Sequence, residues 1–132
     1  MRYIFDSSAI YSLVKRGMPE ILAQNYTCDL ARYELGNILI NEGRMKTLSE
    51  TEQKSALDLI VRALNLLASV DIRDNEEDIL RAAIDYTLSF YDASYVNLAK
   101  RTGAVLVTED EKLVKKINGY IKVISAEELP AQ

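Results

Sequence analysis

The chain of 132 residues carries a net charge of −4, a pI near 4.9 and no histidine. Its length suits a single domain over residues 1–132, and its 48% hydrophobic content allows one buried core. The lack of histidine excludes Ser-His-Asp and Cys-His catalysis in their usual forms, together with histidine-rich zinc and iron sites. Glycine loops of the Walker or dinucleotide-binding type are also absent, so any chemistry depends on carboxylates, hydroxyls, lysines, arginines or tyrosines.

The N-terminus and the single cysteine predict an intracellular protein. Cys28 has no second cysteine to pair with, and Asp6 interrupts the first residues before an apolar run of signal-peptide length can form. Residues 57–70, the most apolar stretch, are too few and too polar to span a bilayer. We therefore expect a cytoplasmic protein outside the membrane. Its negative charge argues against a nucleic-acid binder, unless the acids gather at a metal site where cations reverse the local sign.

The first part of the chain alternates strand and helix signals. Strands are expected at residues 2–5 and 26–28, and helices at 7–15, 19–23 and 29–42. Ser7 or Ser8 is expected to cap the first helix, and Asp29 to cap the third, which Gly43 ends.

The middle of the chain is mostly helical. Helices are expected at residues 50–68, 75–89 and 92–102, with a short strand at 70–72. Ser49 and Glu52 have capping-box spacing, Asn75 is expected to cap the second helix, and Gly103 to end the third. We expect the helices at 50–68 and 75–89 to pack together as a hairpin.

The last part of the chain predicts strand, helix and strand. A continuous apolar run at 104–107 suits a buried central strand, and it is followed by a helix at 110–116 and a strand at 120–124. Strands that alternate with helices indicate an α/β protein. We predict a three-layer α/β/α fold whose central, mostly parallel sheet has about five short strands.

Four acids stand out in this arrangement. Asp6 follows the first predicted strand and Asp110 lies just after residues 104–108, where ligands bind in open α/β sheets. Glu34 lies near the apolar face of its helix, and Asp92 lies among aromatic and small residues. Asp6 and Asp110 alone also fit a helix cap that complements the helix dipole, and Asp92 alone fits an N-cap. A divalent cation explains best why several half-buried acids converge where histidine is absent.

The motifs around these acids resemble those of PIN-domain nucleases, in the same order. The segments are residues 4–9 (Asp-x-Ser), 33–37 (Glu with Asn three positions later), 91–99 and 105–110 (Leu-x-Thr-x-Asp). The third segment resembles the family motif along all nine positions, and the resemblance covers almost the whole chain. The length and the helical pair between the second and third motifs are most like VapC-type toxins of prokaryotic toxin–antitoxin pairs.

The resemblance implies a metal-dependent endoribonuclease that hydrolyses RNA, with Mg²⁺ or Mn²⁺ as cofactor. It assigns metal binding and catalysis to four acids, with the first and third as principal ligands: Asp6, Glu34, Asp92 and Asp110. Glu109 and Glu111 remain alternatives to Asp110, which its spacing from Thr108 favours. An RNA substrate, a cognate antitoxin protein and a homodimer are the expected partners.

Several polar residues have two possible interpretations. They support the site or contact the substrate, or they are ordinary capping and solvent-exposed residues. They are Ser8, Asn37, Thr108 and Lys112. The eight tyrosines fit core or surface positions better than base stacking. Phosphatases of the haloacid dehalogenase type and response-regulator receivers fit worse, because the second acid that each needs beside the first strand is missing. The remaining alternative is a PIN fold that serves as a scaffold with little or no catalysis.

Overall fold

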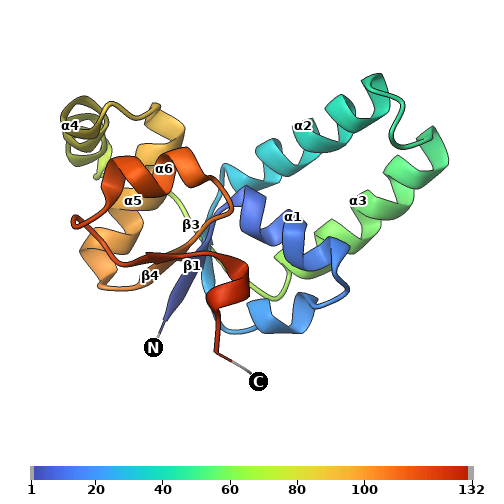
Figure 1. The fold of residues 1–132 in the computed structure, drawn as a ribbon, viewed down its shortest axis with the longest axis horizontal. Helices are drawn as coiled ribbons and strands as arrows, with labels where there is room; N and C mark the ends of the chain where they lie inside the picture. The colour runs from blue at the N-terminus through green and yellow to red at the C-terminus, as the bar shows by residue number, and fades with distance from the viewer. Residues whose placement is uncertain (1, 131–132) are drawn as a thin grey trace.

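The computed structural model describes residues 2–130, which form a five-stranded parallel sheet in the order β3-β2-β1-β4-β5 (Figure 1). The strands are β1 (Tyr3–Phe5), β2 (Tyr26–Cys28), β3 (Ala68–Val70), β4 (Val105–Val107) and β5 (Val123–Ile124). The α-helices are α1 (Ser7–Lys15), α2 (Ala31–Arg44), α3 (Glu50–Leu64), α4 (Glu76–Tyr86), α5 (Phe90–Thr102) and α6 (Glu111–Ile117). Two short 3₁₀ helices complete the chain, η1 (Pro19–Leu22) and η2 (Ala126–Glu128).

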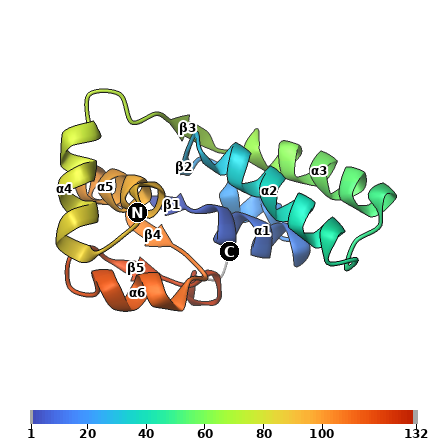
Figure 2. The same ribbon diagram turned by 90° about the horizontal axis from the view of Figure 1, so that it is seen from above.

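The helices form two outer layers. α1, α2 and α3 lie on one side of the sheet, and α4, α5 and α6 lie on the other (Figures 1 and 2). This arrangement confirms the predicted three-layer α/β/α fold. It follows from right-handed crossovers, because the chain moves from β1 outward to β3 and then returns past β1 to β4 and β5.

The return of the chain creates a switch point between β1 and β4, which pair directly. β1 leads to β2 on one side of this point, and β4 leads to β5 on the other. The loops beyond the carboxyl ends of the two strands therefore diverge and leave room for a ligand. The residues that follow these strands, Asp6 and Thr108, are both buried.

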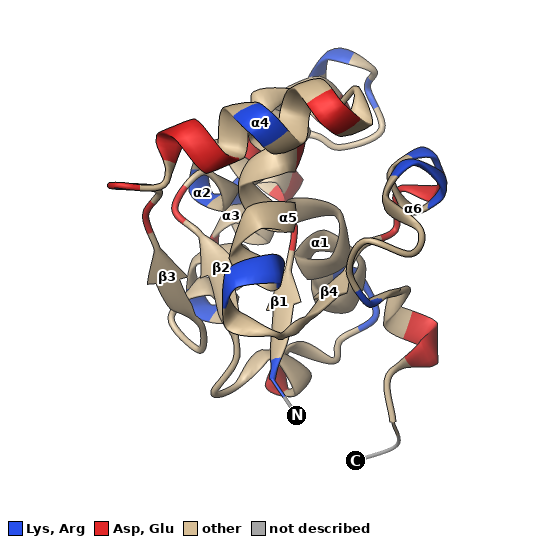
Figure 3. Cartoon of the chain, turned by 90° about the vertical axis from the view of Figure 1, so that its left-hand side faces the viewer, with Lys and Arg blue, Asp and Glu red and all other residues tan. Residues whose placement is uncertain are grey.

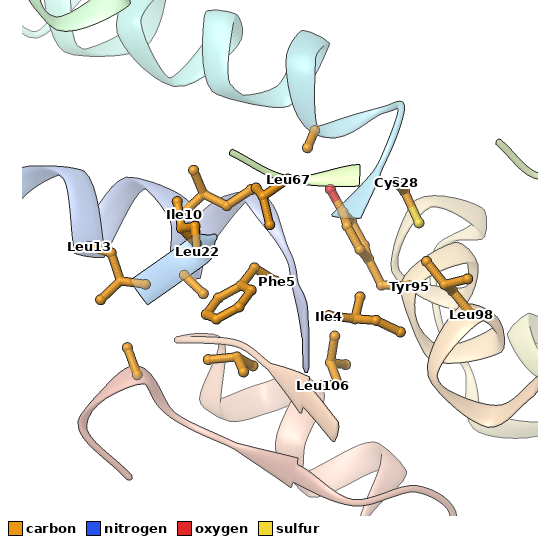
Figure 4. Packing of buried hydrophobic residues seen from close by; sticks show 14 of the residues in the cluster. Ile4, Phe5, Ile10, Leu13, Leu22, Cys28, Leu67, Tyr95, Leu98 and Leu106 are labelled. Atoms are coloured by element: carbon orange, nitrogen blue, oxygen red, sulfur yellow. The ribbon is translucent and has the colours of Figure 1, made fainter. Parts of the chain in front are cut away.

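The core fills the space between the sheet and both helical layers. Phe5 from β1, Leu106 from β4 and Tyr95 from α5 are among its largest fully buried side chains (Figure 4). All three residues of β4 are buried, as expected for a central strand. Burial of one such side chain stabilises the fold by about 1.5–3 kcal/mol. This packing holds β1 and β4, and with them Asp6 and Thr108, in place.

The predicted hairpin of the helices at 50–68 and 75–89, which are α3 and α4 in the structure, is wrong. α3 packs against α2, and α4 packs against α5 through Ile79, Ala82 and Ala93 (Figure 2). β3 explains the difference, since it pairs with β2 and carries the chain to the other face of the sheet. An apolar helical stripe marks a face to be buried without naming its partner.

Several predicted boundaries also differ from the structure. The β3 strand begins at Ala68 instead of residue 70, because Ala68 pairs with Tyr26, and α3 therefore ends at Leu64. α2 continues through Gly43 to Arg44. The β5 strand is limited to its last two residues.

Some of the predicted helix caps are present in the structure and others are replaced by different contacts. The Ser49–Glu52 capping box and the Gly103 C-cap, with φ of 72°, are confirmed. Asp29 does not cap α2, which starts after Leu30 without a side-chain cap. Asn75 occupies the N-cap of α4, but its side chain donates to the carbonyl of Arg73 instead.

Within residues 2–130, the structure contains no helix with the length and apolar character to cross a membrane.

Candidate active site

Asp6 lies at the end of β1 and is only 6% exposed. One of its carboxylate oxygens accepts hydrogen bonds from the Ser8 hydroxyl at 2.6 Å and from the backbone N–H of Ala9 at 3.0 Å. The other oxygen accepts from the Thr108 hydroxyl. Asp6 is therefore the N-cap of α1, a place predicted for Ser7 or Ser8. Ser8 does not cap the helix; its hydroxyl bonds to the Asp6 carboxylate and orients it.

The electrostatics of Asp6 reflect its burial. Loss of solvent raises the pKa of this carboxyl, and the negative charge of Asp92 raises it further. The hydrogen bonds from Ser8, Thr108 and Ala9 act in the opposite direction. Asp6 is thus held in one orientation by several donors, and no lysine or arginine of residues 2–130 forms an ion pair with it.

Glu34 lies in the first turn of α2 and is half-buried. Its Oε1 accepts a hydrogen bond from the Tyr95 hydroxyl at 2.7 Å. The Tyr95 ring packs in the core with Ile4 and Leu98 (Figure 4). Burial raises the pKa of Glu34, and so do the charges of Asp6 and Asp92, whereas the bond from Tyr95 lowers it.

Asp92 lies in the first turn of α5, whose N-cap is Ser89. The alternative that Asp92 itself caps this helix is therefore wrong. Burial raises the pKa of Asp92, followed by the charge of Asp110, whereas Lys116 and the Ser89 hydroxyl lower it. Lys116 donates to the carbonyl of Thr87 at 2.9 Å and so joins α6 to the turn before α5.

The fourth acid lies between β4 and α6, where the sequence left three alternatives. Asp110 caps α6, its Oδ1 accepting from the backbone N–H groups of Lys112 at 3.0 Å and Leu113 at 3.2 Å. Its own N–H donates to the Thr108 hydroxyl at 3.1 Å. The carboxylate of Glu109 instead accepts from the backbone N–H of Ala126 at 2.8 Å, in the direction of η2. Glu109 thus bonds toward η2 and Asp110 caps α6, and the assignment of the fourth site acid to Asp110 over Glu109 and Glu111 stays a prediction.

The four acids form one electrostatic group. Charge repulsion acts between Asp6 and Asp92, between Glu34 and both of them, and between Asp92 and Asp110. No three acidic side chains within residues 2–130 lie close enough together to form a ready-made metal cage. The donor set is nevertheless composed of oxygen alone, which suits Mg²⁺ or Mn²⁺. A divalent cation would relieve the repulsion, so the residues fit such an ion.

The supporting residues differ in their contacts. Ser8 and Thr108 bond to Asp6, and the Ser8 Oγ also accepts from the backbone N–H of Glu109 at 2.9 Å. Asn37 is exposed and lines a cavity together with Glu34. The side chain of Lys112 is exposed on α6, which also carries Lys115 and Lys116 (Figure 3). The roles of Asn37 and Lys112 stay predictions.

One contributor was missed by the sequence analysis, and a second was not singled out among the lysines. Tyr95 carries a hydroxyl that reaches Glu34 across 61 positions of the chain. Lys116 is the lysine whose charge acts on Asp92. The spacing of Tyr95 three residues after Asp92 places both on one side of α5 and was the available signal for the first. Nothing in the sequence separates Lys116 from the other lysines of its helix.

The family model of the PIN domain matches residues 3–118 of the chain. This chain belongs to the PIN-domain family. The match contains all four acids. The resemblance seen in the motifs is thereby confirmed.

Relatives of this PIN-domain protein are known from Pyrobaculum aerophilum. "Exonuclease VapC9" is 31% identical over 125 residues, which cover 93% of this chain and 91% of the relative. "Ribonuclease VapC3" is 29% identical over 132 aligned residues, covering 92% of this chain and 98% of the relative. Both names belong to VapC-type proteins, as the motifs predicted.

Solved structures share the fold. The crystal structure of PAE2754 from Pyrobaculum aerophilum has a TM-score of 0.81 and 29% identity, covering 96% of this chain and 92% of that one. A toxin–antitoxin complex from Klebsiella pneumoniae has a TM-score of 0.67 and 16% identity, covering 96% and 99% of the two chains. The second likeness concerns the fold alone.

Proposed function

We propose that this PIN-domain protein is a metal-dependent endoribonuclease and the toxin of a toxin–antitoxin pair. The proposal is carried by Asp6 at the end of β1 and Asp110 beyond β4, which Thr108 links by hydrogen bonds, together with the charges of Glu34 and Asp92 that act on this pair. The names of the VapC9 and VapC3 relatives support a nuclease, and that of VapC3 supports RNA as its substrate. The complex from Klebsiella pneumoniae supports an antitoxin partner.

The ligands proposed for Mg²⁺ or Mn²⁺ are the carboxylates of Asp6, Glu34, Asp92 and Asp110. When bound, the ion supplies positive charge that polarises a phosphodiester and activates water for attack. No histidine base is needed for such hydrolysis.

The residues of this chain prepare the site by fixing the acids. Ser8 and Thr108 hold Asp6 from two sides, and Tyr95 holds one oxygen of Glu34. The N-terminus of α6 holds one oxygen of Asp110. Acids that are oriented before the substrate arrives lower the reorganisation that catalysis requires.

Lys116 is the proposed basic contact for the RNA phosphate. Its charge already acts on Asp92, and it lies on a helix that carries two further lysines (Figure 3). A local basic helix offsets the negative net charge of the chain, because phosphate contacts are short-ranged at physiological salt. The expected homodimer and cytoplasmic location stay predictions, since nothing in the fold tests them.

The test combines metal titration with RNA cleavage. Mn²⁺ is expected to give a saturable rise in the melting temperature of the wild type, because binding to the native state stabilises it. The same titration of Asp6→Asn is expected to give little or no rise, and Asp6→Asn is expected not to cleave RNA. A saturable rise without cleavage of any RNA by the wild type would support the scaffold alternative instead.

A further inference from the structure

Two strongly exposed tyrosines flank the proposed active site. Tyr33 is 82% exposed and directly precedes Glu34, and Tyr91 is 64% exposed and directly precedes Asp92. Each lies in the first turn of its helix, α2 or α5. Single exposed apolar side chains are ordinary, but two large rings beside the same group of acids form a patch. Core packing does not account for them.

The two tyrosines line the same two cavities. The first, of about 340 Å³, has an apolar lining to which β2, β3 and α5 contribute. Its other lining residues include Cys28, Leu30, Val70, Ile72, Phe90 and Ser94. The second, of about 430 Å³, is lined by Glu34 and Asn37 as well. A group held against these rings therefore lies next to one of the four acids.

The charge of the lining selects the kind of group that fits. Asp29 and Asp71 line the first cavity and Glu34 lines the second, whereas no lysine or arginine of residues 2–130 lines either. Phosphate groups are repelled by such a lining. A flat, uncharged group with apolar faces and N–H groups at its edge fits it, because carboxylates only accept hydrogen bonds.

We infer that Tyr33 and Tyr91 hold one unpaired nucleobase of a single-stranded RNA beside the phosphate to be cleaved. The inference rests on the proposed function, because the strand must continue from the acids into the cavities. Stacking of bases on aromatic rings is the common way in which proteins hold single strands. The acidic edge favours bases that carry an amino group, so adenine, cytosine and guanine are preferred to uracil.

The experiment measures RNA binding in an Asp92→Asn background with Mg²⁺, so that the strand stays intact. The probes are short fluorescent single-stranded RNAs, one with every base and a series in which one nucleotide is abasic. Tyr33→Ala and Tyr91→Ala are compared with Tyr33→Phe and Tyr91→Phe, which keep the ring. Met45→Ala, at a side chain 73% exposed after the end of α2, is the matched control for loss of an exposed apolar group.

We expect each alanine variant to bind the complete RNA roughly 5- to 100-fold more weakly, which corresponds to the stacking of one base. The phenylalanine variants and Met45→Ala are expected to bind as the parent does. An abasic nucleotide at one position is expected to weaken RNA binding by the parent by a similar factor. The same abasic nucleotide is expected to leave binding by the alanine variants unchanged. A 2-aminopurine at that position should lose its fluorescence on binding to the parent but not to the alanine variants.

Other outcomes overturn the inference. The inference fails if the parent and the alanine variants bind the complete RNA equally. It also fails if every abasic RNA loses the same amount of binding to the parent. Alanine variants that keep RNA binding but change the oligomeric mass or lose an antitoxin would identify a protein interface instead. Cleavage by the protein with Asp92 intact is measured separately. If RNA is cleaved while the tyrosine variants behave as wild type, only this inference fails; if no RNA is cleaved, the proposed function fails.

Discussion

Replacing Thr108 by valine tests the hydrogen bonds that hold the proposed active site together. Thr108 is 1% exposed, its hydroxyl donates to the Asp6 carboxylate, and it accepts from the backbone N–H of Asp110 at 3.1 Å. Valine keeps the shape of threonine and removes both bonds, together with a longer contact to the Ser8 hydroxyl at 3.4 Å. The buried Asp6 oxygen and the Asp110 N–H then lose their partner.

The size of the effect follows from these two bonds. A hydrogen bond to a charged group contributes about 1.5–3 kcal/mol, and a half-buried N–H left without a partner costs about 1 kcal/mol. We expect the free energy of unfolding to fall by about 2–4 kcal/mol. For a domain of this length, the melting temperature then falls by about 7–15 °C. The pKa of Asp6 should rise further, because a donor that lowers it is gone.

The assay is thermal denaturation without divalent metal, for Thr108→Val and Thr108→Ser, each with Asp6 and with Asp6→Asn. Serine keeps the hydroxyl and should lose much less stability than valine. The loss caused by valine should shrink clearly in the Asp6→Asn background, because the charged partner is absent and the two sites are coupled. An equal loss in both backgrounds would refute the reasoning, since the effect would then be one of packing.

Three further predictions concern the acids. Asp92→Asn should abolish RNA cleavage and leave the melting temperature without metal equal or higher, because a repelled charge is removed. Tyr95→Phe should lower the free energy of unfolding by about 1–2 kcal/mol, because Glu34 loses a donor at 2.7 Å. The third is a pH dependence. Because the native pKa values of Asp6, Glu34 and Asp92 are raised, the metal-free native state binds more protons than the unfolded chain between the ordinary and the raised values. The stability from these groups is therefore fully present below about pH 4 and is lost as the pH rises through the raised pKa values.

Each of these predictions has its own control. Full metal-dependent cleavage by Asp92→Asn would contradict the mechanism. Tyr11→Phe, at a half-buried tyrosine of α1, is the matched control for Tyr95→Phe and should cost little. For the pH dependence, the melting temperatures of the wild type and of Asp92→Asn are measured at each pH and their difference is compared. The melting temperature of the wild type should fall further below that of Asp92→Asn as the pH rises. Addition of Mn²⁺ at neutral pH should raise it above that of the variant. A difference that is constant with pH would show that the charge of Asp92 is not repelled.

The acids could be predicted because their signals are local. Asp6 directly follows β1 and Asp110 lies three residues after β4, and parallel strands place such residues at one edge of the sheet. The absence of histidine left carboxylates as the main catalytic groups. The contact that turns Glu109 toward η2 could not be predicted, because it depends on Ala126, a residue 17 positions from Glu109.

The sequence by itself determined the element types, the family and the positions of the four acids, since these depend on periodicity, caps and short motifs. Only the tertiary structure decided which helices pack together, because an apolar stripe fits many partners. Tertiary structure also brought Tyr95 to Glu34 and left Tyr33 and Tyr91 exposed beside the same two cavities. Contacts between distant segments depend on how the sheet orders its strands, and that order is a property of the whole chain.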